Sequence, residues 1–123
     1  MKLILDTHVL LWAMSEPERI DRTRLDYIED LSNTVYVSAI SVAEIAIKSS
    51  IGKLAVEFDL LDMIRQCGFK LLDFTAQDAV ILKDLPFHHR DPFDRMLVAQ
   101  CRASGFALVS DDEKLRAYDC RVV

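Results

Sequence analysis

Short apolar runs that alternate with longer helical segments constrain the fold of this chain more than any other feature. Runs rich in Leu, Ile and Val are expected to form strands at 2–5, 35–38, 69–72, 106–109 and, more briefly, 121–123. The segments between these runs have helical periodicity, which is typical of βα units that build a parallel sheet. We therefore predict a single α/β domain over residues 1–123, a three-layer sandwich with a central parallel sheet of about five strands flanked by helices.

Five helices are expected between the strands. Their predicted ranges are 22–31, 42–50, 60–67, 76–83 and 92–104. The last helix has the clearest boundaries, because Asp91 is placed as its N-cap, Pro92 stands at its first position and Gly105 follows its end.

Composition and charge narrow the functional classes. The chain is 51% hydrophobic and 28% charged, as expected for a globular domain, and its net charge of -5 would repel nucleic acid unless cations intervene. The 3 cysteines have no metal-ligand spacing, which predicts reduced thiols and a cytoplasmic protein. No apolar run approaches the roughly 20 residues of a membrane helix and no signal-peptide pattern opens the chain, so we expect neither membrane insertion nor secretion.

Four acidic residues lie where such a fold would bring them to one end of the sheet. They are Asp6, Glu44, Asp94 and Asp112. Asp6 and Asp112 follow predicted strands, Glu44 lies just past another strand, and Asp94 opens the last long helix. In open parallel sheets, binding sites lie at the carboxyl ends of the strands. We predict that the four carboxylates converge there and hold a metal ion.

The first two acids also have purely structural interpretations. Asp6 could act as the N-cap of a helix that begins near Val9, because its carboxylate would accept hydrogen bonds from free amides. Glu44 could form an ordinary ion pair with Lys48, four residues further along the same helix.

The other two acids are ambiguous in the same way. Asp94 occupies the third position of its helix, where a carboxylate interacts well with the helix dipole, and Asp91 would already cap that end. Asp111 and Asp112 both precede a short final helix, so one could cap it while the other takes part in chemistry.

Four motifs in order give the chain a family resemblance. Residues 5–12 (LDTHVLLW), 38–48 (SAISVAEIAIK), 89–100 (HRDPFDRMLVAQ) and 108–112 (LVSDD) resemble the acidic motifs of PIN-domain ribonucleases, in particular VapC-like toxins of bacterial toxin-antitoxin pairs. The resemblance extends over nearly the whole chain. It implies a PIN-like three-layer sandwich and an endoribonuclease that hydrolyses RNA to leave a 5′-phosphate and a 3′-hydroxyl.

The resemblance also assigns residues. The catalytic and metal-binding carboxylates fall on Asp6, Glu44, Asp94 and Asp112. Thr7 and Ser110 match hydroxyl residues of the family that orient a water or a neighbouring carboxylate. Asp111 adds an acid to the last motif and leaves its assignment open, although we favour Asp112.

Clustered carboxylates within about 4–6 Å repel one another unless a divalent cation compensates their charge. Mg²⁺ or Mn²⁺ suits such oxygen ligands, whereas Zn²⁺ would call for His or Cys at ligand spacing. His88 and His89 are adjacent, so we interpret them as loop residues that contact substrate phosphate or face solvent. The bound ions are expected to activate the water that attacks the RNA phosphodiester.

The residues give less information about binding partners than about the metal site. Lys48, Arg90 and Arg95 are the cations nearest the acidic motifs, and they either hold substrate phosphates or are solvated. Family resemblance implies a cognate antitoxin and a homodimer. The apolar segment 45–61 either offers a surface to such a partner or completes the core of the domain.

Two other functions remain open from the sequence. A receiver-like phosphoacceptor module is also a small α/β domain with an acidic Mg²⁺ pocket, but it would need paired acids after the first strand, where Thr7 and His8 follow Asp6. A catalytically silent PIN-fold binding module would have lost at least one carboxylate, and all four are present.

Overall fold

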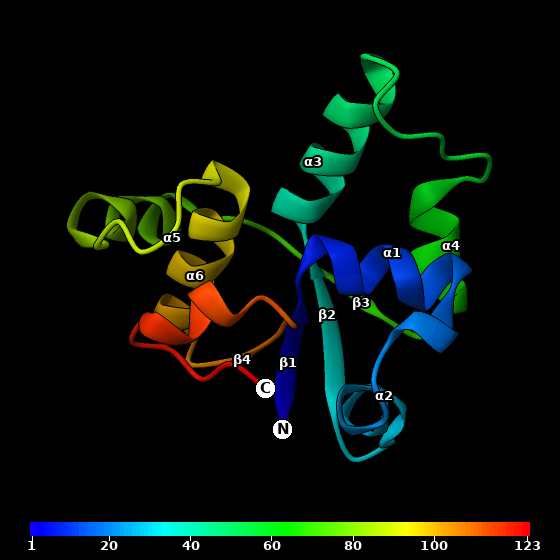
Figure 1. Cartoon of the computed structure of the whole chain (residues 1–123), viewed down its shortest axis with the longest axis horizontal. Coiled ribbons are helices and arrows are strands. Elements are labelled where there is room, and N and C mark those ends of the chain that lie inside the picture. Colours follow the sequence, from blue (N-terminus) through cyan, green and yellow to red (C-terminus); the bar gives the residue numbers. More distant parts are fainter.

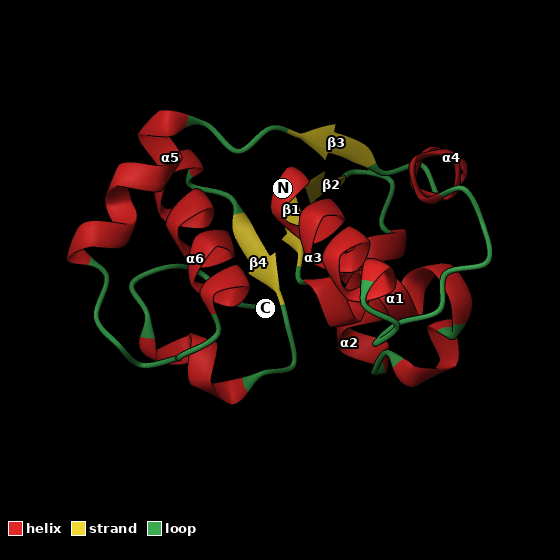
Figure 2. Ribbon diagram, turned by 90° about the horizontal axis from the view of Figure 1, so that it is seen from above, coloured by secondary structure: helices red, strands yellow, loops and turns green.

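A parallel sheet between two layers of helices forms the framework of the domain (Figure 1; Figure 2). The computed structural model describes residues 1–123. The strands are β1 (Lys2–Leu5), β2 (Thr34–Ser38), β3 (Lys70–Leu72) and β4 (Ala107–Val109). Their order is β3-β2-β1-β4, and all neighbouring strands are parallel. The predicted α/β class is therefore confirmed.

The predicted fifth strand at the end of the chain is reduced to one isolated bridge between Leu108 and Val122. The Leu108 amide donates to Arg121 O at 2.8 Å and the Val123 amide donates to Leu108 O at 2.9 Å. The last helical turn ends at Ala117, and the segment after it meets β4 through this single bridge and not through a regular strand.

The strand order also separates this fold from the receiver alternative. Flavodoxin-like receiver modules have the order 2-1-3-4-5, in which the third strand lies beside the first. Here β1 lies between β2 and β4, and β3 forms an edge. The receiver interpretation is therefore wrong.

Six α-helices and three short 3-10 helices connect the strands. They are α1 (Thr7–Ser15), η1 (Pro17–Arg19), α2 (Arg22–Glu29), α3 (Ala39–Ser50), α4 (Leu60–Gln66), α5 (Ala76–Val80), η2 (Ile81–Asp84), α6 (Pro92–Ser104) and η3 (Glu113–Ala117). None of these helices combines the length and the apolar character needed to cross a lipid bilayer.

Local capping explains where the helices begin and end. Helix α3 starts three residues before the predicted 42, because Ser38 Oγ accepts a hydrogen bond from the Ile40 amide at 3.1 Å directly after β2. Helix α6 has its predicted bounds, with Asp91 as N-cap and Gly105 in the left-handed conformation at φ 76°. The predicted helix at 76–83 instead divides into α5 and η2.

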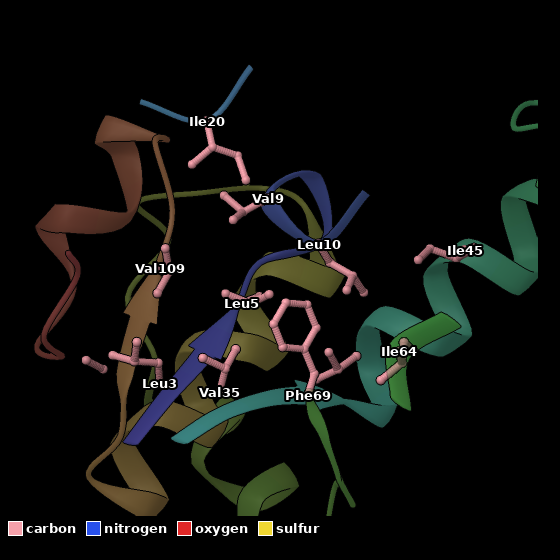
Figure 3. Packing of buried hydrophobic residues seen from close by; sticks show 12 residues of the cluster. Leu3, Leu5, Val9, Leu10, Ile20, Val35, Ile45, Ile64, Phe69 and Val109 are labelled. Carbon is pink, nitrogen blue, oxygen red and sulfur yellow. The ribbon is translucent and has the colours of Figure 1, made fainter. Parts of the chain in front are cut away.

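Alternating side chains of each strand divide the core into two clusters, one on either face of the sheet. Leu3 and Leu5 of β1 point to the face covered by α1 and α4, where they pack with Val9, Leu10 and Ile64 (Figure 3). This face contributes a cluster of 12 buried residues, which anchors α1 directly behind the end of β1.

The opposite face of the sheet carries α6 and η3. Ile4 and Leu108 lie in a second cluster with Leu97 and Val98 of α6 and Leu115 of η3. Figure 2 shows α5 and α6 on one side of the sheet and α1, α2 and α4 on the other. The two clusters fix the starts of α1, α6 and η3 around the carboxyl ends of β1 and β4.

Candidate metal centre

A pocket of about 420 Å³ opens at the carboxyl ends of β1 and β4. It is lined by Asp6, His8, Trp12, His89, Asp91, Asp94, Asp111 and Asp112. Five of these eight residues are aspartates, which come from the start of α1, the start of α6 and the segment after β4. Three of the four predicted carboxylates therefore meet in one pocket, and the fourth, Glu44, lies beside it on α3.

Asp6 is both a helix cap and a pocket residue. Its backbone amide extends the sheet by donating to Val109 O at 3.0 Å, and its Oδ1 accepts from the Val9 amide at 2.7 Å. The residue is only 4% exposed. Burial raises the pKa of Asp6, while hydrogen bonding by the Ser110 side chain and the Val9 amide opposes that rise. The capping interpretation and the functional one are thus compatible.

Glu44 is almost fully buried on α3, and its two oxygens have different surroundings. Oε2 accepts from Lys48 Nζ at 2.6 Å, as the ion-pair interpretation predicts. Oε1 is buried and has no hydrogen-bond partner within the protein. A buried carboxylate oxygen without a partner is costly, so it points to a ligand that completes the site.

Asp94 has a strongly perturbed carboxyl in the pocket. Burial, followed by the negative charges of Asp91, Asp6 and Glu44, raises the pKa of Asp94 from 3.8 to about 6. The repulsion shows that four carboxylates share one electrostatic environment. The raised pKa of Asp94 therefore reflects how close Asp6 and Glu44 lie to it.

Asp112 is held by both of its oxygens. Oδ1 caps η3 by accepting from the Lys114 amide at 3.0 Å, and Oδ2 lies 2.8 Å from His89 Nε2. Burial opposes ionisation, but the hydrogen bonds to His89 and Lys114 lower the pKa of Asp112 overall. Neighbouring Asp111 is exposed at the pocket rim, which favours Asp112 as the acid of the last motif.

Ser110 and Thr7, the two hydroxyl residues predicted to support the site, make different contacts in the structure. Ser110 is fully buried, and its Oγ accepts from the Asp112 amide at 3.1 Å, so it does support a site carboxylate. Thr7 donates to Ser41 Oγ at 3.0 Å and thereby ties α1 to α3. It therefore supports the relative placement of Asp6 and Glu44 through the backbone.

The structure does not support the prediction that Arg95 binds substrate phosphate. Arg95 is 7% exposed and stacks on the ring of Phe87 at 4.0 Å. Its guanidinium donates to Pro86 O at 2.8 Å, to Tyr118 OH at 3.2 Å and to Leu85 O at 3.2 Å. The buried charge is thus occupied in holding the loop before α6.

The other two predicted cations have different environments. Lys48 pairs with Glu44, and hydrogen bonding to that carboxylate raises the pKa of Lys48, with further contributions from Asp91 and Asp94. Arg90 is exposed. Of the three predicted cations, only Arg90 can therefore bind a phosphate without first breaking a buried contact.

Sequence reasoning missed the central position of His89. Its Nε2 lies within 3.4 Å of Asp94 Oδ2 and 2.8 Å of Asp112 Oδ2, so one imidazole lies between two of the predicted site acids. Its partner Asp112 is 23 residues away in the chain, and that pairing leaves no local pattern. Only the place of His89 two residues before the helix cap could have drawn attention to it.

The donor set fits a hard divalent cation. Side-chain nitrogen and oxygen atoms of His89, Asp94 and Asp112 lie within 4.8 Å of one another, so the two carboxylates are close enough to share one cation. The pocket otherwise offers carboxylate oxygens, and the unpartnered Oε1 of Glu44 is a further donor beside it. Carboxylates are the preferred protein ligands of Mg²⁺ and Mn²⁺.

The chain is similar to known proteins over nearly its whole length. A family model described as the PIN domain matches residues 3–119. Ribonuclease VapC22 of Mycobacterium tuberculosis is 28% identical over 119 residues, which cover 94% of this chain and 91% of that protein.

Solved structures show the same fold. A crystal structure of VapBC2 from Rickettsia felis bound to a promoter DNA fragment contains a chain with 16% identity and a TM-score of 0.74, covering 100% of this chain and 98% of that one. A DNA-bound VapBC from Salmonella typhimurium gives 18% identity and a TM-score of 0.73, covering 100% and 97%. The PIN-like three-layer sandwich is therefore confirmed.

Proposed function

This chain belongs to the PIN domain family, and from that premise we propose that it is a metal-dependent endoribonuclease, the toxin of a toxin-antitoxin pair. The relative from Mycobacterium tuberculosis is named a ribonuclease, and the proposal extends that activity to this chain. The observation that carries it is the meeting of Asp6, Asp94 and Asp112 in one pocket, although they come from three separate segments.

All four carboxylates expected of an active nuclease are retained. Asp6, Asp94 and Asp112 line the pocket, and Glu44 acts on Asp94 electrostatically. A silent binding module has no need to keep these acids together, because the burial of Asp6 and Asp94 and the repulsion of Asp94 by Asp6 and Glu44 destabilise the fold. Their retention favours catalysis over binding alone.

We propose Mg²⁺ or Mn²⁺ as the cofactor, held by Asp6, Asp94 and Asp112 with Glu44 completing the acidic site. When bound, such a cation supplies Lewis acidity that activates water and offsets charge on the phosphodiester. Cation binding also turns an acidic pocket into one that attracts phosphate, which a chain of net charge -5 requires.

The chain's own residues then have distinct tasks. The buried Asp6 is fixed by the Val9 amide, so its carboxylate keeps one orientation toward the pocket. Asp94 takes up a proton readily in the free protein and must release it when a cation binds. Arg90, exposed at the loop before α6, is the cation that we assign to substrate phosphate.

We propose a cognate antitoxin as the protein partner and a homodimer as the assembly. Support comes from two sources: the similar solved structures are of VapBC complexes, and large apolar side chains are exposed on α3 and at the start of α4. These side chains are Ile47, Ile51 and Leu61, which are 48%, 59% and 39% exposed. By contrast, Leu54 and Val56 of the same predicted segment pack against the core.

Cleavage of RNA by the purified chain tests the proposal. We expect the protein to cut single-stranded RNA with Mg²⁺ or Mn²⁺ and to leave 5′-phosphate and 3′-hydroxyl ends, with no cleavage in excess EDTA. Asp6→Asn and Asp94→Asn should abolish cleavage while the circular dichroism spectrum stays unchanged. Asp84→Asn, an exposed acid on η2, is the matched control. Parental cleavage by either site variant would contradict the proposal.

A further inference from the structure

We propose that His89 is a positioning residue of the metal centre, whose Nε2–H donor holds the Asp112 carboxylate beside that of Asp94. The inference rests on the proposed nuclease function, because it assigns a task within the same site. The residue belongs to a loop before α6, and none of the family's acidic positions assigns it a role.

The hydrogen bonds around the ring determine its tautomer. The backbone amide of Asp91 donates to His89 Nδ1 at 3.0 Å. A backbone N–H can only donate, so Nδ1 presents a lone pair and carries no proton. The ring proton is therefore on Nε2. Asp91 thus has two roles: its side chain caps α6, and its backbone amide holds the ring of His89.

The Nε2–H group faces the carboxylates of two site acids. It lies 2.8 Å from Asp112 Oδ2, a hydrogen-bond distance, and 3.4 Å from Asp94 Oδ2. These acids belong to segments on either side of β4, and only the shared donor joins them. With Oδ1 of Asp112 accepting from the Lys114 amide, the His89 donor leaves that carboxylate one orientation.

The backbone of His89 is itself anchored. Its amide donates to Tyr118 OH at 2.9 Å, and the same hydroxyl accepts from Arg95 at 3.2 Å. The His89 side chain is 13% exposed. The backbone amide of His89 and both of its ring nitrogens are each held by a contact within the protein. The fold therefore sets the position of the ring, as expected for a group that orients metal ligands.

Two substitutions separate the two ends of the ring. In His89→Gln the amide nitrogen can take the place of Nε2 and still donate to Asp112, whereas the acceptor for the Asp91 amide is lost. In His89→Asn the side-chain oxygen can take the place of Nδ1 and accept from Asp91, whereas no donor reaches Asp112. His88→Gln makes the same change at the exposed neighbour and is the control.

Mn²⁺ affinity, measured by titration calorimetry on the full chain without RNA, is the readout. We expect His89→Asn and His89→Ala to weaken Mn²⁺ binding by about 10- to 100-fold, and His89→Gln to stay within about threefold of the parent. His88→Gln should match the parent. Parental Mn²⁺ affinity in His89→Asn, or equal losses in the Asn and Gln variants, would overturn the inference.

A second measurement needs no variant. Long-range proton–nitrogen NMR correlations of the ¹⁵N-labelled protein should show His89 as the Nε2–H tautomer at pH 7.5, and the Nδ1–H tautomer would overturn the inference. Neither readout requires RNA cleavage. A protein that binds Mn²⁺ as expected but cuts no RNA would contradict the proposed function and leave the role of His89 in the centre intact.

Discussion

Lys48 Nζ donates to Glu44 Oε2 at 2.6 Å, while Oε1 of the same buried carboxylate has no partner in the protein. Half of the Glu44 carboxylate is therefore compensated by an internal cation and half is left for a ligand. The lysine side chain is 38% exposed and that of the glutamate 4%. The pair thus connects the buried face of α3 to the acidic pocket.

Replacing Lys48 by Met should lower the free energy of unfolding of the metal-free protein. Binding of a divalent cation should restore that lost stability. Loss of the ammonium group leaves a buried charge without a partner, at a cost of about 1–3 kcal/mol, less than for a fully buried pair because Lys48 is partly exposed. Urea denaturation with EDTA, and again with excess Mn²⁺, measures the loss and its recovery.

The double variant Glu44→Gln, Lys48→Met provides the control for the Lys48 prediction. It removes both charges, so its free energy of unfolding in EDTA should exceed that of Lys48→Met alone. Lys53→Met, at an exposed lysine, should match the parent. A Lys48→Met protein as stable as the parent in EDTA would show that Glu44 does not depend on this lysine.

Asp94→Asn should stabilise the metal-free protein at pH 7.5 even though it abolishes cleavage. The pKa of Asp94 is about 6 in the folded protein, against an ordinary value of 3.8. The folded state therefore binds more protons between these values, and stability declines as pH rises through that window. Removing the charge should recover about 2 kcal/mol at pH 7.5.

The pH dependence checks the sign of this effect. At pH 4.5 the Asp94 carboxyl is largely protonated in the folded protein, so the advantage of the Asn variant should shrink to near zero. Thermal unfolding in EDTA at both pH values measures the difference. An advantage that grows as the pH falls would contradict the assigned origin of the shift.

Metal binding should weaken as the pH falls through about 6. Below that pH a cation must displace the Asp94 proton, which costs up to about tenfold in affinity for each pH unit. The raised pKa of Asp6 acts in the same direction. Mn²⁺ titrations between pH 5 and 7.5 provide the measurement, and an affinity that is flat over this range would contradict the prediction.

Sequence reasoning succeeded where the signal is local. Asp91, Pro92 and Gly105 define α6 because caps and turns depend on neighbouring residues, and the helix has its predicted bounds. Strand-end positions of Asp6 and Asp112 were equally readable, since all parallel strands present their carboxyl ends at one edge. The predicted strand at 121–123 is wrong in extent, because only one isolated bridge joins Val122 to Leu108.

Long-range side-chain contacts were out of reach of the sequence. Nothing local distinguishes Arg95, whose partners include Tyr118, 23 residues away, from a solvated arginine on a helix. The adjacent His88 and His89 predict loop residues that contact phosphate or face solvent, whereas His89 contacts Asp112, which follows β4. Such pairings are fixed by packing of α6 and η3 on the sheet, which no spacing rule encodes.

Arg95 and Arg90, five residues apart, should respond to substitution in opposite ways. Arg95→Ala leaves the Leu85 and Pro86 carbonyls without their donor and empties the face of Phe87, so we expect a loss of about 2–4 kcal/mol in the free energy of unfolding. Arg95→Lys should recover only part of this loss, because one ammonium cannot reproduce the fork of a guanidinium.

Arg90→Ala should leave stability within about 0.5 kcal/mol of the parent, since the side chain is exposed, and should raise the KM for RNA instead. Urea denaturation and steady-state cleavage of a short labelled RNA separate the two effects. An Arg95→Ala protein of parental stability with a raised KM would restore Arg95 as the phosphate-binding residue, because a guanidinium that contributes nothing to folding is free to bind substrate.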